Sequence, residues 1–220
     1  MPAHNEEALL SGCLLSLQQA ARLSARPVRL LVVADACTDQ TVRRAREAGV
    51  TVIEICSRNV GAARADGMRA VLRQTPQADP ADVWLATTDA DTLVPPGWLA
   101  RQLSHADQGW DAVLGTVTVA DWADRPTHAA DTFTAHYSHD DGPHPHVHGA
   151  NFGIRASAYL AAGGFPTLRT AEDHALLRAL SAVGVAVKRA NDITVQTSAR
   201  RHARAPDGFS HLLGTLTDPP

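Results

Sequence analysis

Short apolar segments alternate with amphipathic segments through the first hundred residues of this chain. Apolar runs typical of strands occur at 28–34, 50–55 and 83–87, whereas 8–17 and 60–72 carry apolar side chains at helical spacing. When strands and helices alternate in this way, successive strands lie parallel and the helices cover the sheet. The sequence therefore predicts an α/β fold with a mostly parallel sheet flanked by helices.

Two acidic residues follow the apolar run at 83–87. Asp89 and Asp91 are separated by one residue and precede a Pro-Pro-Gly stop. Side chains at positions i and i+2 of an extended segment point the same way, here into the crevice where open α/β sheets bind ligands. Carboxylate oxygens there suit Mg²⁺ or Mn²⁺, which usually sits between protein and a substrate phosphate. Taken alone, the triplet Asp89-Ala90-Asp91 is also typical of a surface turn.

Polar residues follow the other predicted strands as well. The block 2–7, Pro-Ala-His-Asn-Glu-Glu, precedes the first helix, with Asn5 as its expected N-cap, and Asp35 ends the strand that follows. Further on, Gly61 permits a sharp turn, and Arg64, just inside the next helix, can reach a phosphate or a base. From the residues alone, Asp35 can equally be a turn carboxylate and Arg64 a solvated helix residue.

Six blocks resemble, in their order, those of family 2 glycosyltransferases. They are Pro2–Glu7, Asp35–Thr41, Asn59–Arg64, the Asp89/Asp91 pair, Gly149–Arg155 with Gly163-Gly164-Phe165, and Glu172–Leu176. The resemblance implies a Rossmann-like GT-A fold, a nucleotide-diphospho-sugar donor, a Mg²⁺ or Mn²⁺ ion and inversion at the anomeric carbon. The implied reaction moves one sugar to a hydroxyl acceptor.

The resemblance also implies roles for individual residues. Asp91 is expected on the metal and Asp89 on the ribose or the metal, with His174 as a further metal candidate. Asp173 is expected to take the proton of the acceptor hydroxyl, supported by Glu172. The alternative is that both acids have no catalytic role and only cap the N-terminus of a helix. The residues expected to contact the donor are Pro2, Ala3, His4, Glu6, Asp35, Arg64, Asp89, Asn151, Arg200 and Arg204.

Arginines cluster near the end of the chain. Arg200, Arg201 and Arg204 lie between a Thr-Ser turn and a Pro-Asp-Gly turn. Guanidinium groups match phosphate oxygens, so this stretch can close over the donor diphosphate. The alternative is a solvated basic tail.

Histidines alternate at 144, 146 and 148. On an extended segment they share a face, which is one requirement of a zinc site, but no Cys or further His completes one at ligand spacing. A place in the acceptor region is the favoured interpretation, because His148 directly precedes the Gly149-Ala150-Asn151 block.

Composition narrows the class of protein. We expect 220 residues to form one domain: a nucleotide-binding half at about 1–95, an acceptor-side half at about 96–190 and a basic loop and tail at 191–220. A net charge of −3 gives no electrostatic case for a nucleic-acid partner. Three cysteines without a CxxC pair favour reduced thiols and a cytoplasmic location.

The acceptor is expected to be small or lipid-linked. No apolar run has the roughly 20 residues of a membrane span, so at most a peripheral membrane association is expected. A processive polymer synthase is disfavoured because the Gln-x-x-Arg-Trp motif of that class is missing.

One departure from the family pattern leaves two alternatives open. An apolar strand normally precedes the Pro-Ala-x-Asn-Glu-Glu block, and Met1 stands where it should end, so the first strand is expected to be missing. A start codon placed too late in the gene is the favoured explanation; the alternatives are a strand supplied by a partner and a non-catalytic remnant that binds sugar nucleotides. A nucleotidyltransferase is the other competing class, although residues 2–7 lack its Gly-rich phosphate loop.

Overall fold

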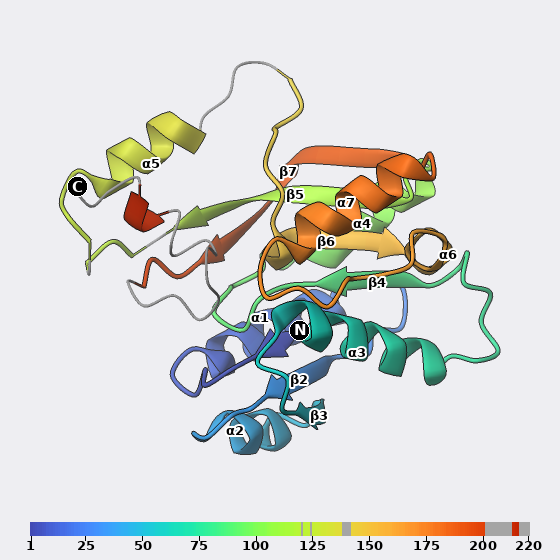
Figure 1. Ribbon diagram of the computed structural model, residues 1–220, viewed down its shortest axis with the longest axis horizontal. Coiled ribbons are helices and arrows are strands. Elements are labelled where there is room, and N and C mark those ends of the chain that lie inside the picture. Colours follow the sequence, from blue (N-terminus) through green and yellow to red (C-terminus); the bar gives the residue numbers. More distant parts are fainter. Residues whose placement is uncertain (120, 124, 138–141, 201–212, 216–220) are drawn as a thin grey trace.

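The computed structural model describes residues 1–119, 121–123, 125–137, 142–200 and 213–215. Within these residues the strands form two sheets, ordered β1-β2-β3 and β4-β6-β5-β7. In Figure 1 the first sheet lies in the lower part of the view and the second sheet lies above it, and helices pack against both. The predicted α/β class is confirmed.

The first sheet is fully parallel. It consists of β1 (Pro2–Ala3), β2 (Leu31–Asp35) and β3 (Thr51–Ile55), connected by α1 (Leu10–Arg22) and α2 (Thr41–Glu47), and it leads into α3 (Val60–Arg73). These elements match the predicted alternation, with boundaries moved by a few residues. β1 has only two residues, both inside the Pro2–Glu7 block, and it lies at the edge of this sheet.

The second sheet is mixed. It contains β4 (Trp84–Thr87), β5 (Ala112–Val119), β6 (Phe152–Arg155) and β7 (Val187–Thr197). β6 runs antiparallel to both β4 and β5, whereas β7 is parallel to β5. The associated helices are α4 (Trp98–Asp107), α5 (Ala129–Tyr137), the short 3₁₀ helix η1 (Gly149–Asn151), α6 (Ala156–Ala161) and α7 (Glu172–Ala182). The sequence pattern did not predict the antiparallel strand.

Two apolar cores lie on opposite faces of the sheets. Successive side chains of a strand point to opposite faces, and in β5 Val113 joins the core under α1 and α4, whereas Leu114 joins the core under α3, α6 and α7. Trp98 of α4 and Phe152 of β6 are among the largest fully buried side chains of these two cores. Burial on both faces explains why the strands read as nearly continuous apolar runs.

Local hydrogen bonds fix where the helices begin. Asn59 caps α3, because its side chain accepts the backbone N–H of Ala62 at 2.9 Å. The expected cap of α1 is wrong: its N-cap position is Leu9, and Asn5 instead accepts the backbone N–H of Thr38 at 2.8 Å. Asn5 therefore ties the first loop to the second rather than starting the helix.

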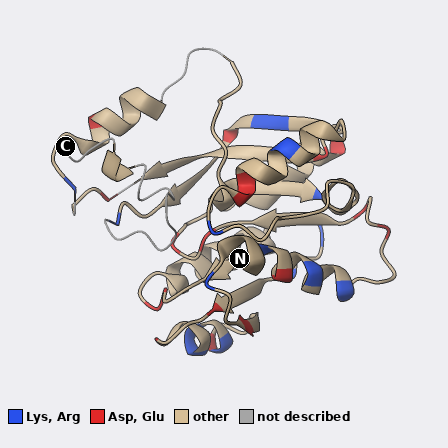
Figure 2. Cartoon of the chain, viewed as in Figure 1, with Lys and Arg blue, Asp and Glu red and all other residues tan. Residues whose placement is uncertain are grey.

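The exposed faces of the helices carry charges of both signs. Acidic and basic residues are interspersed along α2 and α3 (Figure 2), as in the pairs Arg43–Glu47 and Arg69–Asp66. Among the described residues, no helix combines the length and apolar character that crossing a bilayer requires.

Candidate active site

The loops that follow β1, β2, β3 and β4 carry several of the predicted site residues, and others lie in η1, in α7 and after β7. Asp35, at the end of β2, is buried, and its carboxylate accepts the backbone N–H groups of Ser57, Arg58 and Asn59 at 2.7–2.8 Å. A carboxylate has about four acceptor positions, so these three bonds leave room for one further donor. Asp35 thus holds the loop that leads into α3.

The first loop is tied to the second through several groups. The imidazole of His4 donates through Nδ1 to the backbone carbonyl of Asp35 at 2.6 Å, and the backbone N–H of Glu6 donates to Thr41 Oγ1 at 2.7 Å. The backbone N–H of Glu7 donates to Asp39 at 3.0 Å. The block that begins with Pro2 and Ala3 is therefore fixed against the end of β2.

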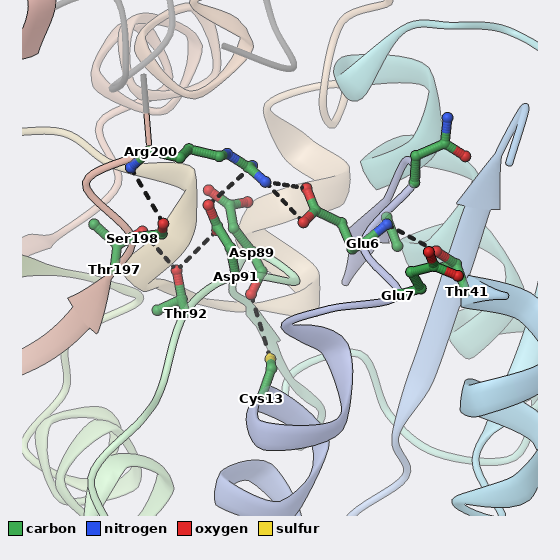
Figure 3. A network of polar contacts seen from close by, with 12 residues as sticks. Glu6, Glu7, Cys13, Thr41, Asp89, Asp91, Thr92, Thr197, Ser198 and Arg200 are labelled. Carbon is green, nitrogen blue, oxygen red and sulfur yellow. Dashed lines mark hydrogen bonds and ion pairs between the residues drawn. The ribbon is translucent and has the colours of Figure 1, made fainter. Parts of the chain in front are cut away.

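Arg200 bridges two carboxylates that are far apart in the sequence. Its Nη1 lies 2.7 Å from both carboxylate oxygens of Glu6, and its Nη2 lies 2.9 Å from Asp91 Oδ2 (Figure 3). The side chains of Glu6 and Asp91 are 6% and 10% exposed, against 24% for Arg200. Burial raises the pKa of Asp91 to about 6; Arg200 opposes this rise, whereas Asp89 and Glu6 add to it.

The backbone that carries Arg200 is fixed from two sides. Thr197, at the end of β7, receives a 3.1 Å hydrogen bond from Thr92, the residue after Asp91 (Figure 3). Arg125 is buried and donates to the carbonyl oxygens of Ala199 and Arg200, both at 2.8 Å. The sequence analysis did not identify Arg125, since only the fold brings it to this segment.

Arg64 forms a second acid–arginine–acid group. Its guanidinium donates to Glu172 Oε1 at 2.9 Å, to Thr87 Oγ1 at 2.7 Å and to Asp89 Oδ1 at 2.6 Å. Burial opposes its charge, but Asp89 and Glu172 outweigh that effect and raise the pKa of Arg64 further. Burial also raises the pKa of Glu172, although Arg64 counteracts it. Arg64 is thus a buried link between β4 and α7 and not a solvated helix residue.

Asp173 lies beside this group at the start of α7. Its Oδ2 accepts the backbone N–H of Gly149 at 2.8 Å, and its Oδ1 accepts that of His174 at 2.7 Å. Asp173 is partly exposed, whereas Glu172 is buried. Of the two acids, Asp173 is therefore the one that is accessible from the surface. The side chain of His174 is exposed.

Asn151 is placed differently from the expectation. It is buried, and its side chain donates to the carbonyls of Thr116 and Ile193 and accepts the indole N–H of Trp98, all at 2.8–3.0 Å. The pairing of β5 with β7 shifts register at Gly115/Thr116, and Asn151 satisfies carbonyls at this bulge. Its amide is therefore engaged by groups of the core.

The three histidines stack instead of converging. The rings of His144, His146 and His148 lie 6.0 and 6.1 Å apart and nearly parallel, and Tyr137 stacks on His146 at 3.7 Å. Parallel rings do not aim their nitrogens at a common point, and within the described residues no group of three His, Cys, Asp or Glu can hold a metal. Burial, with a contribution from His146, lowers the pKa of His148 to about 3, so this imidazole is neutral.

Backbone strain gathers at these loops. Among the described residues, the non-glycine positions with φ near +50° are Asn5, Ala36, Arg58 and Ala171. Each is next to, or hydrogen-bonded to, a candidate: Asn5 precedes Glu6, Ala36 follows Asp35, Arg58 donates to Asp35, and Ala171 precedes Glu172. Such conformations cost about 1–3 kcal/mol each and are typical of functional sites. Beside this strained edge, a pocket of about 400 Å³ is lined by Asn5–Leu9, Asp39 and Arg200.

The sequence model of one family, described as "Glycosyl transferase family 2", matches residues 1–161. The chain belongs to glycosyl transferase family 2. No curated protein sequence matches it significantly. The family assignment argues against the nucleotidyltransferase alternative and leaves open the alternative of a non-catalytic sugar-nucleotide binder.

Solved structures show the same fold at low sequence identity. S. aureus TarS 1-349, crystallised with UDP-GlcNAc, has a TM-score of 0.63 and 16% identity, covering 98% of this chain and 63% of that one. Mannosyltransferase PcManGT from Pyrobaculum calidifontis, in complex with GDP-Man and Mn²⁺, has a TM-score of 0.63 and 20% identity, covering 96% and 66%. M. tuberculosis glucosyl-3-phosphoglycerate synthase has a TM-score of 0.50 and 18% identity, covering 98% and 74%.

This chain has the GT-A fold of these glycosyltransferases. It spans less than two thirds of the length of the TarS chains it matches. Arg204, which was predicted to contact the donor, lies outside the described residues.

Proposed function

We propose that the protein transfers one sugar from a nucleotide-diphospho-sugar to a hydroxyl acceptor by a single displacement with inversion. The observation that carries this proposal is the meeting of three segments: the Asp89/Asp91 turn, the first loop with Glu6, and the start of α7 with Asp173. Two arginines, Arg64 and Arg200, join these segments through direct contacts.

The donor site of this proposal is the edge where the loops after β1, β2 and β4 meet. Backbone groups of Pro2, Ala3 and His4, together with the remaining acceptor position of Asp35, face the nucleotide base. Arg200 supplies a partly exposed cation for the diphosphate, since it is the more accessible of the two arginines. The proposed division leaves residues from about 1 to 95 for the nucleotide and from about 96 to 190 for the acceptor.

No group of three protein ligands converges within the described residues, but one or two carboxylates here fit a divalent cation that substrate phosphates also hold. Four carboxyl groups face only the two guanidinium groups of Arg64 and Arg200; they belong to Glu6, Asp89, Asp91 and Glu172. Asp91 is therefore close to the carboxylates of Asp89 and Glu6 as well as to Arg200. Hard oxygen donors of this kind suit Mg²⁺ or Mn²⁺ that is held by one or two carboxylates and by substrate phosphates. Asp91, with Asp89, would hold the ion, which when bound would stabilise the charge developing on the departing diphosphate. The exposed His174 is not needed for this set.

Asp173 is the proposed general base. Backbone N–H groups hold both of its oxygens, and about two acceptor positions remain for an acceptor hydroxyl. A base on the side of the reacting carbon opposite the diphosphate takes the proton as the hydroxyl attacks, and this geometry inverts the anomeric configuration. Arg64 holds the carboxylate of Glu172. Glu172 therefore supports Asp173 indirectly, as its neighbour at the start of α7.

A panel of nucleotide sugars with Mn²⁺ tests the proposal. A donor that binds only the native state raises the melting temperature, and the stabilising donors are then assayed for transfer to small and lipid-linked hydroxyl acceptors. We expect stabilisation by at least one UDP- or GDP-sugar, loss of that effect in EDTA, and a product of inverted configuration by proton NMR. Equal nucleoside-diphosphate affinity in EDTA and Mn²⁺ would contradict the role of the cation, and a retained configuration would contradict the single displacement.

A further inference from the structure

Arg64 contacts the donor side and the acceptor side of the proposed site at once. It lies in α3, its side chain is 3% exposed, and its three nitrogens point to three different segments. Nε meets Glu172 at the start of α7, Nη1 meets Thr87 at the end of β4, and Nη2 meets Asp89. Because the guanidinium is planar and rigid, its partners cannot move relative to one another without breaking a hydrogen bond.

The acceptor side is packed directly on the same guanidinium. Gly149 lies against it so closely that a Cβ at this position would collide with Nη2. The backbone N–H of Gly149 in turn holds Asp173 Oδ2 at 2.8 Å. On another side, the ring of Phe165 lies 5.8 Å from the guanidinium carbon. Arg64 therefore determines the place of Asp173 in two ways: through Gly149, and through the neighbouring Glu172.

We propose that Arg64 is a positioning residue that sets the separation between the donor-side carboxylate of Asp89 and the acceptor-side carboxylate of Asp173. This inference rests on the proposed function, in which the two carboxylates lie on opposite sides of the reacting carbon. In a single displacement the attacking oxygen, the carbon and the leaving oxygen must be in line, and a misplacement of about 1 Å can cost on the order of 100-fold in rate.

A purely stabilising role for the ion pair is the competing explanation, and variants can separate the two. Replacing Arg64 alone would leave Glu172 buried without a cation, so the protein could fail to fold. Glu172→Gln is therefore the reference: it removes that charge and keeps an oxygen that can accept from Arg64 Nε. Adding Arg64→Met then removes the rigid link while an apolar side chain fills the space. Arg69→Met on the same Glu172→Gln background is the matched control, because Arg69 is an exposed residue of α3 whose ion pair is with Asp66, one turn away.

Thermal melting, calorimetric nucleoside-diphosphate affinity and steady-state kinetics are compared for the three proteins. We expect Arg64→Met to lower kcat by a further 30- to 100-fold beyond Glu172→Gln, with less than a tenfold change in diphosphate affinity and a cooperative melt. Arg69→Met should leave kcat of its background unchanged. A further loss of no more than about threefold in the folded Arg64→Met/Glu172→Gln protein would overturn the proposal.

A second measurement does not depend on activity. The Gly149 amide should exchange with deuterium at least tenfold faster in Arg64→Met/Glu172→Gln than in Glu172→Gln, because its hydrogen bond to Asp173 loses support. Unchanged exchange at Gly149 would overturn the positioning role even in an active protein. If the wild-type protein transfers no sugar, the proposed function fails, and the exchange experiment still decides whether Arg64 places Asp173.

Discussion

Replacing Arg200 with Ala should weaken diphosphate binding and also destabilise the ligand-free protein. A hydrogen bond to a charged group contributes about 1.5–3 kcal/mol, so losing one such contact to the donor diphosphate lowers affinity by about 10- to 150-fold. In the ligand-free protein, the change leaves Glu6 and Asp91, which are 6% and 10% exposed, without their shared cation. Breaking a buried pair in this way costs about 3 kcal/mol at the lower end of its range, which we take because Arg200 is itself 24% exposed.

Calorimetry with UDP, GDP and the matching nucleosides tests this prediction. The ratio of diphosphate to nucleoside affinity should fall in Arg200→Ala and recover in part in Arg200→Lys, which keeps the charge but not the fork of donors. Arg101→Ala is the control, because Arg101 is an exposed residue of α4 whose contact is to the carbonyl of Asp192. If Arg200→Ala binds diphosphates as the wild type does, Arg200 only pairs Glu6 with Asp91, and its assignment to the donor is wrong.

Three further predictions concern the support of the site. The pKa of His148 is about 3 in the folded state against 6.5 in the unfolded chain. The stabilisation linked to the neutral imidazole is therefore complete above pH 6.5 and is lost as the pH falls towards 3. Between pH 7.5 and 4.5 the contribution of His148 to this loss is about 3 kcal/mol, and denaturant titrations should show a shallower decline in His148→Gln; parallel curves would refute this. Asp35→Ala removes three hydrogen bonds from the loop before α3, so amide hydrogen exchange at residues 57–59 should become faster and nucleoside binding weaker. Unchanged amide exchange at these residues would contradict this prediction. Gly115→Ala should lower the melting temperature strongly, because its Cβ would overlap the amide of Asn151; a wild-type melting temperature would contradict the packing described at the bulge.

The sequence predicted the fold and the places of the acids because both follow from local patterns. Apolar runs of strand length followed by helical spacing specify an α/β sheet, and Asp35, Asp89 and Asp91 stand where those runs end. The antiparallel β6 was not predictable in this way, since its direction depends on its pairing with β4 and β5, which are distant in the sequence.

The sequence could not show which side chains pair with one another in the folded protein. Arg200 and Glu6 are 194 positions apart, and Arg64 and Glu172 are 108 apart. The Asn59–Arg64 block singled out Arg64, but nothing local showed that it is buried among acids whereas Arg69 is exposed on the same helix. Asn151 was expected to contact the donor; that its amide satisfies carbonyls at a β-bulge is a feature that only the register of β5 with β7 reveals.

The central claim is that Asp173 takes the proton of the acceptor hydroxyl. Asp173→Asn keeps the shape of the side chain and removes the proton acceptor, so single-turnover transfer from a bound donor measures this role directly. The account predicts a rate lowered by about 10²- to 10⁴-fold, with nucleoside-diphosphate affinity and melting temperature close to those of the wild type. Transfer at a near wild-type rate in Asp173→Asn would contradict it.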